Sequence, residues 1–127
     1  MTENEIASII VDAAFKIHKT LGPGLFESVY EATLVFELQK RGLRVTQQAS
    51  LPLQYEGVEL ELGFRVDLIV GDKVIVEIKS VDALAPIHKK QLLTYLRLTD
   101  LRLGLLINFN VELIKYGIQR VANRLVD

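Results

Sequence analysis

The sequence predicts an α/β fold, in which a mixed central β-sheet is flanked by helices. Two observations predict it. Apolar residues recur at helical spacing in the first third of the chain and again after residue 86, whereas alternating or continuous apolar stretches lie between and after these segments. The resulting order is helix, helix, three strands, helix and strand. Elements in this order bury their apolar faces when the helices pack on the faces of one sheet.

The first two elements are predicted to be helices, over residues 2–19 and 25–41. Thr2 and Glu5 have the spacing of a capping box, which satisfies free N–H groups at a helix start. Glycine and proline at positions 22–24 end the first helix. The apolar residues of the second helix cover more than one face, which predicts that it is buried on two sides.

The following stretches have the alternating or continuously apolar pattern of strands, and one has a helix pattern that begins with proline. The predicted strands are 45–55 (with a break at Pro52), 58–70, 73–80 and 103–109, and the predicted helix is 86–98. The tail has no clear pattern. Residues 117–122 fit either an edge strand or the start of a last helix.

Length and composition are those of one domain, and we expect that domain to cover residues 1–127. Of the 127 residues, 50% are hydrophobic, which is enough for one core. The absence of cysteine excludes disulfides and cysteine-ligated zinc. No signal-peptide pattern or membrane-length apolar run is present, so we expect a cytoplasmic protein without membrane contact.

Two charged residues interrupt the third predicted strand. Glu77 and Lys79 are two positions apart, so they project from one face of the sheet. Alone, this pair is more typical of a half-exposed strand. However, Asp67 lies near the end of the preceding strand between Val66 and Leu68, where an unpaired buried carboxylate is costly. A metal ion offsets that cost.

The sequence therefore predicts a site for Mg²⁺ (or Mn²⁺) formed by Asp67, Glu77 and the backbone carbonyl of Ile78, because these cations prefer oxygen ligands. Lys79 beside the ion would orient a water molecule or stabilise charge on a phosphate. The site depends on strand register. A two-residue loop would put the carboxylates on opposite faces, so we predict a three-residue loop at 71–73, or a bulge, with Asp67 opposite Glu77.

Two helices offer further polar side chains to this site. Glu27 and Glu31 share one helix face and are more typical of a solvated acidic edge, although a third carboxylate at the site is reasonable. Gln91 and Tyr95 also share a face. They belong either to an ordinary amphipathic helix or to the support of the metal site. Basic residues of the same helix would then contact phosphates, namely Lys89, Lys90 and Arg97.

The net charge of −1 argues against tight non-specific binding of nucleic acid, so any such contact depends on a local basic patch. Two alternatives therefore remain open. One is a non-catalytic nucleic-acid-binding module. The other is a protein-interaction module, with the apolar second helix forming a homodimer face. The two histidines, His18 and His88, lie near helix ends and are expected to be structural.

Taken together, the motifs resemble those of a known family. Gly24, Glu27 and Tyr30, within HKTLGPGLFESVYE, occupy the naming positions of the bacterial GxxExxY family, which is assigned to the PD-(D/E)XK nuclease-like superfamily. Asp67 after FRV and Glu77-Ile78-Lys79 follow in order. The later stretch QLLTY resembles the Q-x-x-x-Y motif of exonuclease domains in bacterial recombination complexes. The resemblance covers residues 6–123.

The resemblance implies a restriction-endonuclease-like core and a divalent-metal-dependent nuclease that hydrolyses phosphodiester bonds, most commonly in DNA. It implies that Asp67 and Glu77 are metal ligands and that Lys79 is the catalytic lysine. Glu27 would be the first-helix acid, with Gln91 and Tyr95 as the supporting helix pair.

Overall fold

The computed structural model describes residues 1–126, with the side chains of all but residues 61 and 62. The observed order confirms the predicted one, and the tail forms a short 3-10 helix and a strand. The elements are α1 (Glu3–Leu21), α2 (Glu27–Lys40), β1 (Val45–Tyr55), β2 (Val58–Val70), β3 (Val74–Lys79), α3 (Pro86–Thr99), β4 (Leu103–Asn108), η1 (Ile114–Tyr116) and β5 (Ile118–Ala122).

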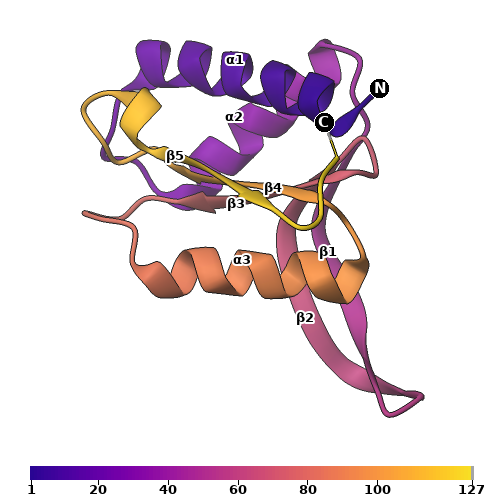
Figure 1. Ribbon diagram of the computed structural model, residues 1–127. Helices are drawn as coiled ribbons and strands as arrows, with labels where there is room; N and C mark the ends of the chain where they lie inside the picture. The colour runs from indigo at the N-terminus through magenta and orange to yellow at the C-terminus, as the bar shows by residue number, and fades with distance from the viewer. Residues whose placement is uncertain (127) are drawn as a thin grey trace.

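The strands form one five-stranded mixed sheet in the order β1-β2-β3-β4-β5. Strands β3 and β4 are parallel, while the other neighbouring pairs are antiparallel. A parallel pair needs a crossover connection, and α3 supplies it. Figure 1 shows α1 and α2 on one face of the sheet and α3 on the other. This is the fold class that the sequence predicts.

The sheet separates two apolar cores. The larger core lies beneath α1 and α2 and takes side chains such as Leu68, Val76 and Leu105 from the sheet. The smaller core lies beneath α3 and includes Ile75, Val66, Leu92, Leu96, Leu106 and Val121. Gly104 lets α3 approach β4 closely, because a Cβ at this position would lie 2.8 Å from the Leu92 side chain.

Helix α1 begins with the predicted capping box, since the Thr2 hydroxyl accepts from the Glu5 backbone N–H and the Glu5 carboxylate accepts from that of Thr2. The prediction that α2 is buried on two sides is wrong. Leu34 and Leu38 are fully buried, but Phe36 is 64% exposed on the opposite side of the helix. The reason is that the main contacts of α2 are with α1 and the sheet, so its outer apolar residues face solvent.

Strands β1 and β2 form a long hairpin that extends beyond α3 (Figure 1). Its turn is made by Glu56 and Gly57, both with positive φ angles, as a tight hairpin requires. The register shifts between Pro52 and Leu53, where proline cannot donate to the ladder. The break predicted at Pro52 is therefore confirmed as an irregularity within one strand.

Candidate metal centre

The register between β2 and β3 decides whether the predicted carboxylates can meet. Paired residues are Val70 with Val74, Ile69 with Ile75 and Leu68 with Val76. The loop between them therefore has three residues, 71–73, and the Lys73 N–H donates back to the Val70 carbonyl over 3.1 Å. The three-residue loop is confirmed. Continuing this register by one residue places Asp67 opposite Glu77.

The backbone pairing of β2 with β3 ends at Leu68 and Val76. Next to this pair, side-chain hydrogen bonds connect the two strands. The Ile78 N–H donates to Asp67 Oδ2 over 2.8 Å, and the Asp67 N–H donates to Glu77 Oε1 over 3.3 Å. Each carboxylate thus binds the backbone of the opposite strand. The two acidic side chains are held together where β2 leaves β3.

At the same place, the side chains of β2 change the face of the sheet on which they pack. Val66 packs in the core under α3 and Leu68 in the core under α1 and α2, although strict alternation would put them on one face. In β1, Gln48 lies between the partners of Leu68 and Val66, across from Asp67, and its φ of 48° is rare for a residue other than glycine. Asp67 therefore lies at a rotation of the hairpin, which exposes its carboxylate beside Glu77.

Gln48 connects this rotation to helix α2. Its side-chain amide donates to Glu31 Oε1 over 2.7 Å and to Asp67 Oδ1 over 3.4 Å, and the Gln47 amide also reaches Glu31. Glu31, one turn after Glu27, is therefore the α2 carboxylate that is linked to Asp67. The sequence pattern puts Glu31 on the same helix face as Glu27 but does not indicate a role for Gln48.

Electrostatics distinguish Glu77 from an ordinary strand carboxylate. Glu77 is only 8% exposed. Burial and, to a smaller extent, the neighbouring Asp67 charge together raise the pKa of Glu77 to about 8, while Lys79 acts in the opposite direction. Among the described residues, the ion pairs within 4 Å include neither Asp67 nor Glu77. Negative charge at this position is therefore poorly compensated by protein cations.

The backbone adds a further oxygen. In an extended strand, the N–H and C=O of one residue point to the same side. The Ile78 N–H faces Asp67, so the Ile78 carbonyl also points toward the gap that β2 leaves. Two carboxylates and a carbonyl form a hard-oxygen donor set, which suits Mg²⁺ or Mn²⁺. The group of ligands predicted from the sequence fits a divalent cation on these grounds.

A third carboxylate does not join this pair directly. No group of three or more His, Cys, Asp or Glu side chains positioned to hold a metal occurs in the described part of the chain. Glu27 is exposed in the first turn of α2. That turn lies close to the end of β3, because the Ser80 hydroxyl donates to the Leu25 carbonyl over 2.6 Å. Glu27 is thus near the strand that carries Glu77 and outside its immediate contacts.

Tyr30, three residues after Glu27, has a structural role. Its fully buried ring stacks on Phe109 with centroids 4.5 Å apart. Its hydroxyl donates to the Gly22 carbonyl over 2.6 Å and accepts from the Leu25 N–H over 3.2 Å. Tyr30 therefore fixes the glycine-rich bend that positions the start of α2.

Helix α3 brings Tyr95 to the two carboxylates. Burial raises the pKa of the Tyr95 hydroxyl, and the negative charges of Glu77 and Asp67 raise it further, which places this group within their electrostatic reach. The Tyr95 ring stacks on Phe64 of β2, with centroids 4.9 Å apart. Gln91, one turn earlier, is exposed on the same flank of α3.

Residues 4–121 match the sequence profile of the PD-(D/E)XK nuclease superfamily. The chain belongs to this superfamily. Members of the PD-(D/E)XK nuclease superfamily generally use divalent metals and interact with nucleic acid. No curated protein gives a significant sequence match.

A solved structure supports the superfamily assignment at the level of the fold. The crystal structure of SSO0001 aligns with a TM-score of 0.57 at 23% sequence identity. The alignment covers 79% of this chain and 52% of that one, so the chain corresponds to about half the length of SSO0001. A restriction-endonuclease-like arrangement, with a mixed sheet between helices, is therefore shared. Within the described residues, no helix is long and apolar enough to cross a membrane.

The basic residues of α3 and the two histidines have distinct positions in this PD-(D/E)XK fold. Lys89 and Lys90 line a pocket toward β5, on the flank of α3 away from Tyr95. His18 forms a hydrogen bond to the Val111 carbonyl, and His88 accepts from the Ala85 N–H at the start of α3. The histidines thus make the structural contacts expected of residues near helix ends.

Proposed function

We propose that the protein is a divalent-metal-dependent nuclease that hydrolyses phosphodiester bonds in DNA, and that it belongs to the GxxExxY group within its superfamily. The observation that carries the proposal is the contact between Asp67 and Glu77 at the point where β2 leaves β3. A buried carboxylate facing a second carboxylate is electrostatically unfavourable without a cation. The proposal assigns this activity to a single domain.

In this proposal, Asp67, Glu77 and the Ile78 carbonyl hold Mg²⁺ or Mn²⁺. The bound cation supplies Lewis-acid activation of water and of the scissile phosphate. Lys79 follows on the same face of β3 and is half-buried, so its ammonium group stabilises charge that develops on the phosphate. Glu77 must release its proton to act as a ligand, because a ligating carboxylate is deprotonated.

The proposal gives the flanking residues supporting roles. Tyr95 is held by Phe64 within electrostatic reach of both carboxylates, where its hydroxyl is suited to hydrogen-bonding water or phosphate. Gln91 lies one helical turn away and would contact the same substrate phosphates. Glu27 would act from the start of α2, through a water molecule or a second cation, because it lies outside the immediate carboxylate contacts.

The decisive experiment is a cleavage assay on linear, nicked and single-stranded DNA with Mg²⁺ or Mn²⁺. We expect cleavage by the wild type that EDTA abolishes, and loss of cleavage by Glu77→Ala and by Lys79→Ala. The control is Lys40→Ala, which removes an exposed lysine at the distant end of α2 and should cleave normally. Cleavage that persists in EDTA, or in both site variants, would refute the mechanism.

Two other outcomes point to the alternatives. Salt-dependent DNA binding without cleavage of any substrate would indicate a non-catalytic binding module on the same fold. A stable oligomer that binds no nucleic acid at low salt would indicate a protein-interaction module. The exposed apolar residues of α2, including Val29 and Phe36, are the surface through which a second copy would dock in that case.

A further inference from the structure

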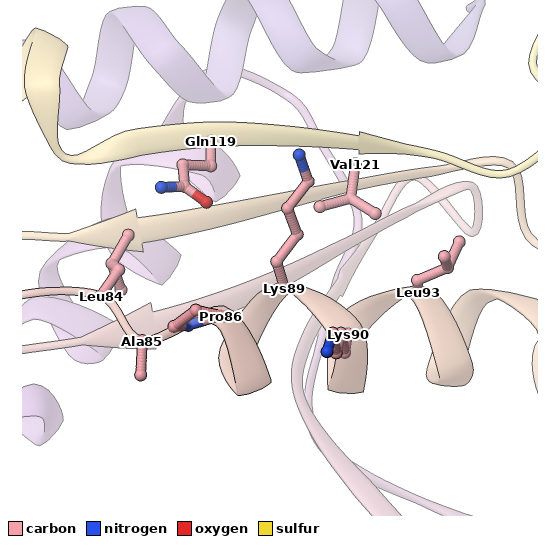
Figure 2. Close-up of a pocket in the computed structure, with 8 residues that line it drawn as sticks. All are labelled: Leu84, Ala85, Pro86, Lys89, Lys90, Leu93, Gln119 and Val121. Carbon is pink, nitrogen blue, oxygen red and sulfur yellow. The ribbon is translucent and has the colours of Figure 1, made fainter.

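A pocket of about 390 Å³ lies between the start of α3 and the edge strand β5. Its floor and walls are largely apolar, with Leu84, Leu93 and Val121 contributing side chains (Figure 2). Its polar groups are few. Figure 2 shows the Lys89 side chain extending from α3 toward β5, where Gln119 projects back toward the helix. An ammonium group and an amide thus both border an apolar surface.

This pocket is separate from the candidate metal centre, yet close to it. Glu77 pairs with Leu106 across β3 and β4, and Leu106 pairs with Gln119 across β4 and β5. Directly paired residues share a face, so Glu77 and Gln119 lie on the same side of the sheet, roughly 10 Å apart at two strand spacings. Helix α3 covers Leu106 between them. The two sites therefore occupy opposite flanks of one helix.

The charge of the pocket selects the kind of ligand. Lys89 and Lys90 line it, and none of the described lining residues is acidic. This local positive charge contrasts with the net charge of −1 for the whole chain. Neither lysine takes part in the ion pairs that the described residues form. An anionic group is the natural partner of their ammonium groups.

The apolar floor and the amide restrict the ligand further. A free phosphate would leave the surface of Leu84, Leu93 and Val121 uncovered. A nucleobase has a flat face that packs on apolar surface and an edge that accepts and donates hydrogen bonds, as the Gln119 amide does. The volume is within the range of small-molecule sites, which begins at about 300 Å³. One nucleotide satisfies the apolar floor, the amide and the ammonium group together.

We propose that this pocket binds a single-stranded nucleotide of the substrate, with its base on the apolar floor beside Gln119 and its phosphate at Lys89. The proposal rests on the proposed nuclease function and adds a second contact to it. A strand anchored on one flank of α3 passes the helix start and reaches the metal centre on the other flank. The pocket therefore holds the substrate strand in place and explains how a weakly acidic chain grips DNA.

The first test maps binding directly. Amide shifts in ¹⁵N-labelled protein are followed in EDTA during titration with thymidine 5′-monophosphate, thymidine and inorganic phosphate. We expect the monophosphate to shift the amides of Lys89, Leu93, Gln119 and Val121 at lower concentration than either fragment. Shifts confined to other regions would overturn the proposal. An acidic peptide that shifts these amides at lower concentration than the nucleotide would also overturn it.

The second test uses charge variants and a labelled single-stranded dodecathymidylate, again in EDTA to prevent turnover. Lys89→Ala should make the negative slope of log affinity against log salt shallower by about 0.7, the value for one phosphate contact on a single strand. Gln119→Glu should weaken binding, because the carboxylate loses the amide N–H donors offered to the base and adds negative charge to the pocket. The matched controls are Lys40→Ala and Gln39→Glu, which make the same charge changes at the exposed end of α2.

The outcomes separate this inference from the proposed function. Normal metal-dependent cleavage together with Lys89→Ala behaving like Lys40→Ala would overturn the pocket and leave the nuclease intact. Nucleotide shifts at the pocket in a protein that cleaves no DNA would support the pocket and overturn the nuclease. Correct folding of each variant is checked by its amide spectrum, so an unfolded variant does not count as a loss of binding.

Discussion

Two glutamates in this protein are equally buried and have opposite electrostatic surroundings. Glu37 in α2 and Glu77 in β3 are both 8% exposed. Glu37 lies 2.9 Å from the Lys16 ammonium group and 3.6 Å from the Arg41 guanidinium group. Glu77 instead faces Asp67. The hydrogen bond from Lys16 lowers the pKa of Glu37, whereas burial raises that of Glu77 to about 8.

The difference teaches how to separate structural carboxylates from functional ones. The exposed fraction of the residue alone does not distinguish them, because it is 8% for both, although burial dominates the pKa shift only at Glu77. The Glu37 cluster supplies its own cations and joins α1 to α2, with Arg41 also contacting Asp12. Among the described residues, no cation lies within ion-pair distance of Asp67 or Glu77, so this pair of acids is poorly compensated. A cation from solution completes the second arrangement, and the first needs none.

The largest effect expected from this contrast is on catalysis. Glu77→Gln should reduce DNA cleavage by about 100-fold or more, as expected when a group that acts in the transition state is lost. Glu37→Gln should change cleavage by less than about twofold, since surface-side ion pairs contribute little away from the site. Rates are compared under single-turnover conditions with saturating Mg²⁺. Equal losses of cleavage rate in Glu77→Gln and Glu37→Gln would show that the two glutamates do not differ in function.

The next effect concerns metal affinity. Below pH 8 the metal-free protein holds a proton on Glu77, and a cation must displace it. Affinity for Mn²⁺ should therefore rise with pH, by up to about tenfold per pH unit between 6 and 8, and level off above 8. Calorimetry in two buffers of different ionisation enthalpy should detect about one proton released per ion at pH 6.5. A pH-independent affinity would show that Glu77 is not a ligand.

The sequence predicts most of the fold and the central acids of the site, because both depend on local pattern. Apolar periodicity places every helix and strand up to β4 within a few residues. The requirement that Asp67 and Glu77 meet correctly predicts the three-residue loop. The sequence of the tail fits either a strand or a helix, because β5 is a short edge strand with Gln119 and Arg120 exposed in its middle.

The parts that the sequence does not predict depend on the rotation of the β1–β2 hairpin. Glutamine has no preference for positive φ, so nothing in the sequence marks Gln48 as the residue opposite Asp67. The same rotation brings Phe64 onto Tyr95. The predicted burial of both sides of α2 failed for a related reason, since apolar residues do not reveal how many neighbours a helix has.

A third prediction uses the stability of the metal-free protein. The ordinary pKa of a glutamate is 4.5, and Glu77 in the folded state has a pKa of about 8. Between these values the folded protein holds a proton that the unfolded chain has lost, so raising the pH favours unfolding. Stability in EDTA should fall from pH 5 to 8, by at most about 1.4 kcal/mol per unit, and then level off.

Glu77→Gln serves as the control for this slope, because glutamine mimics the protonated acid and cannot titrate. Urea unfolding of both proteins in EDTA, at half-unit pH steps, measures the difference. The variant should be as stable as the wild type near pH 5 and more stable at pH 8. A wild-type slope that persists unchanged in Glu77→Gln would assign the titration to another group.

The smallest effect belongs to Glu37 and has the opposite sign. The cations around Glu37 favour its charged form, so its contribution to stability is present above pH 4.5 and disappears as the pH falls through its lowered pKa. Glu37→Gln should cost about 1 kcal/mol at pH 7, the order found for ion pairs that remain partly open to solvent. Urea unfolding should show this deficit shrinking at pH 3. A deficit that stays as large at pH 3 as at pH 7 would mean that Lys16 and Arg41 do not stabilise the charged form of Glu37.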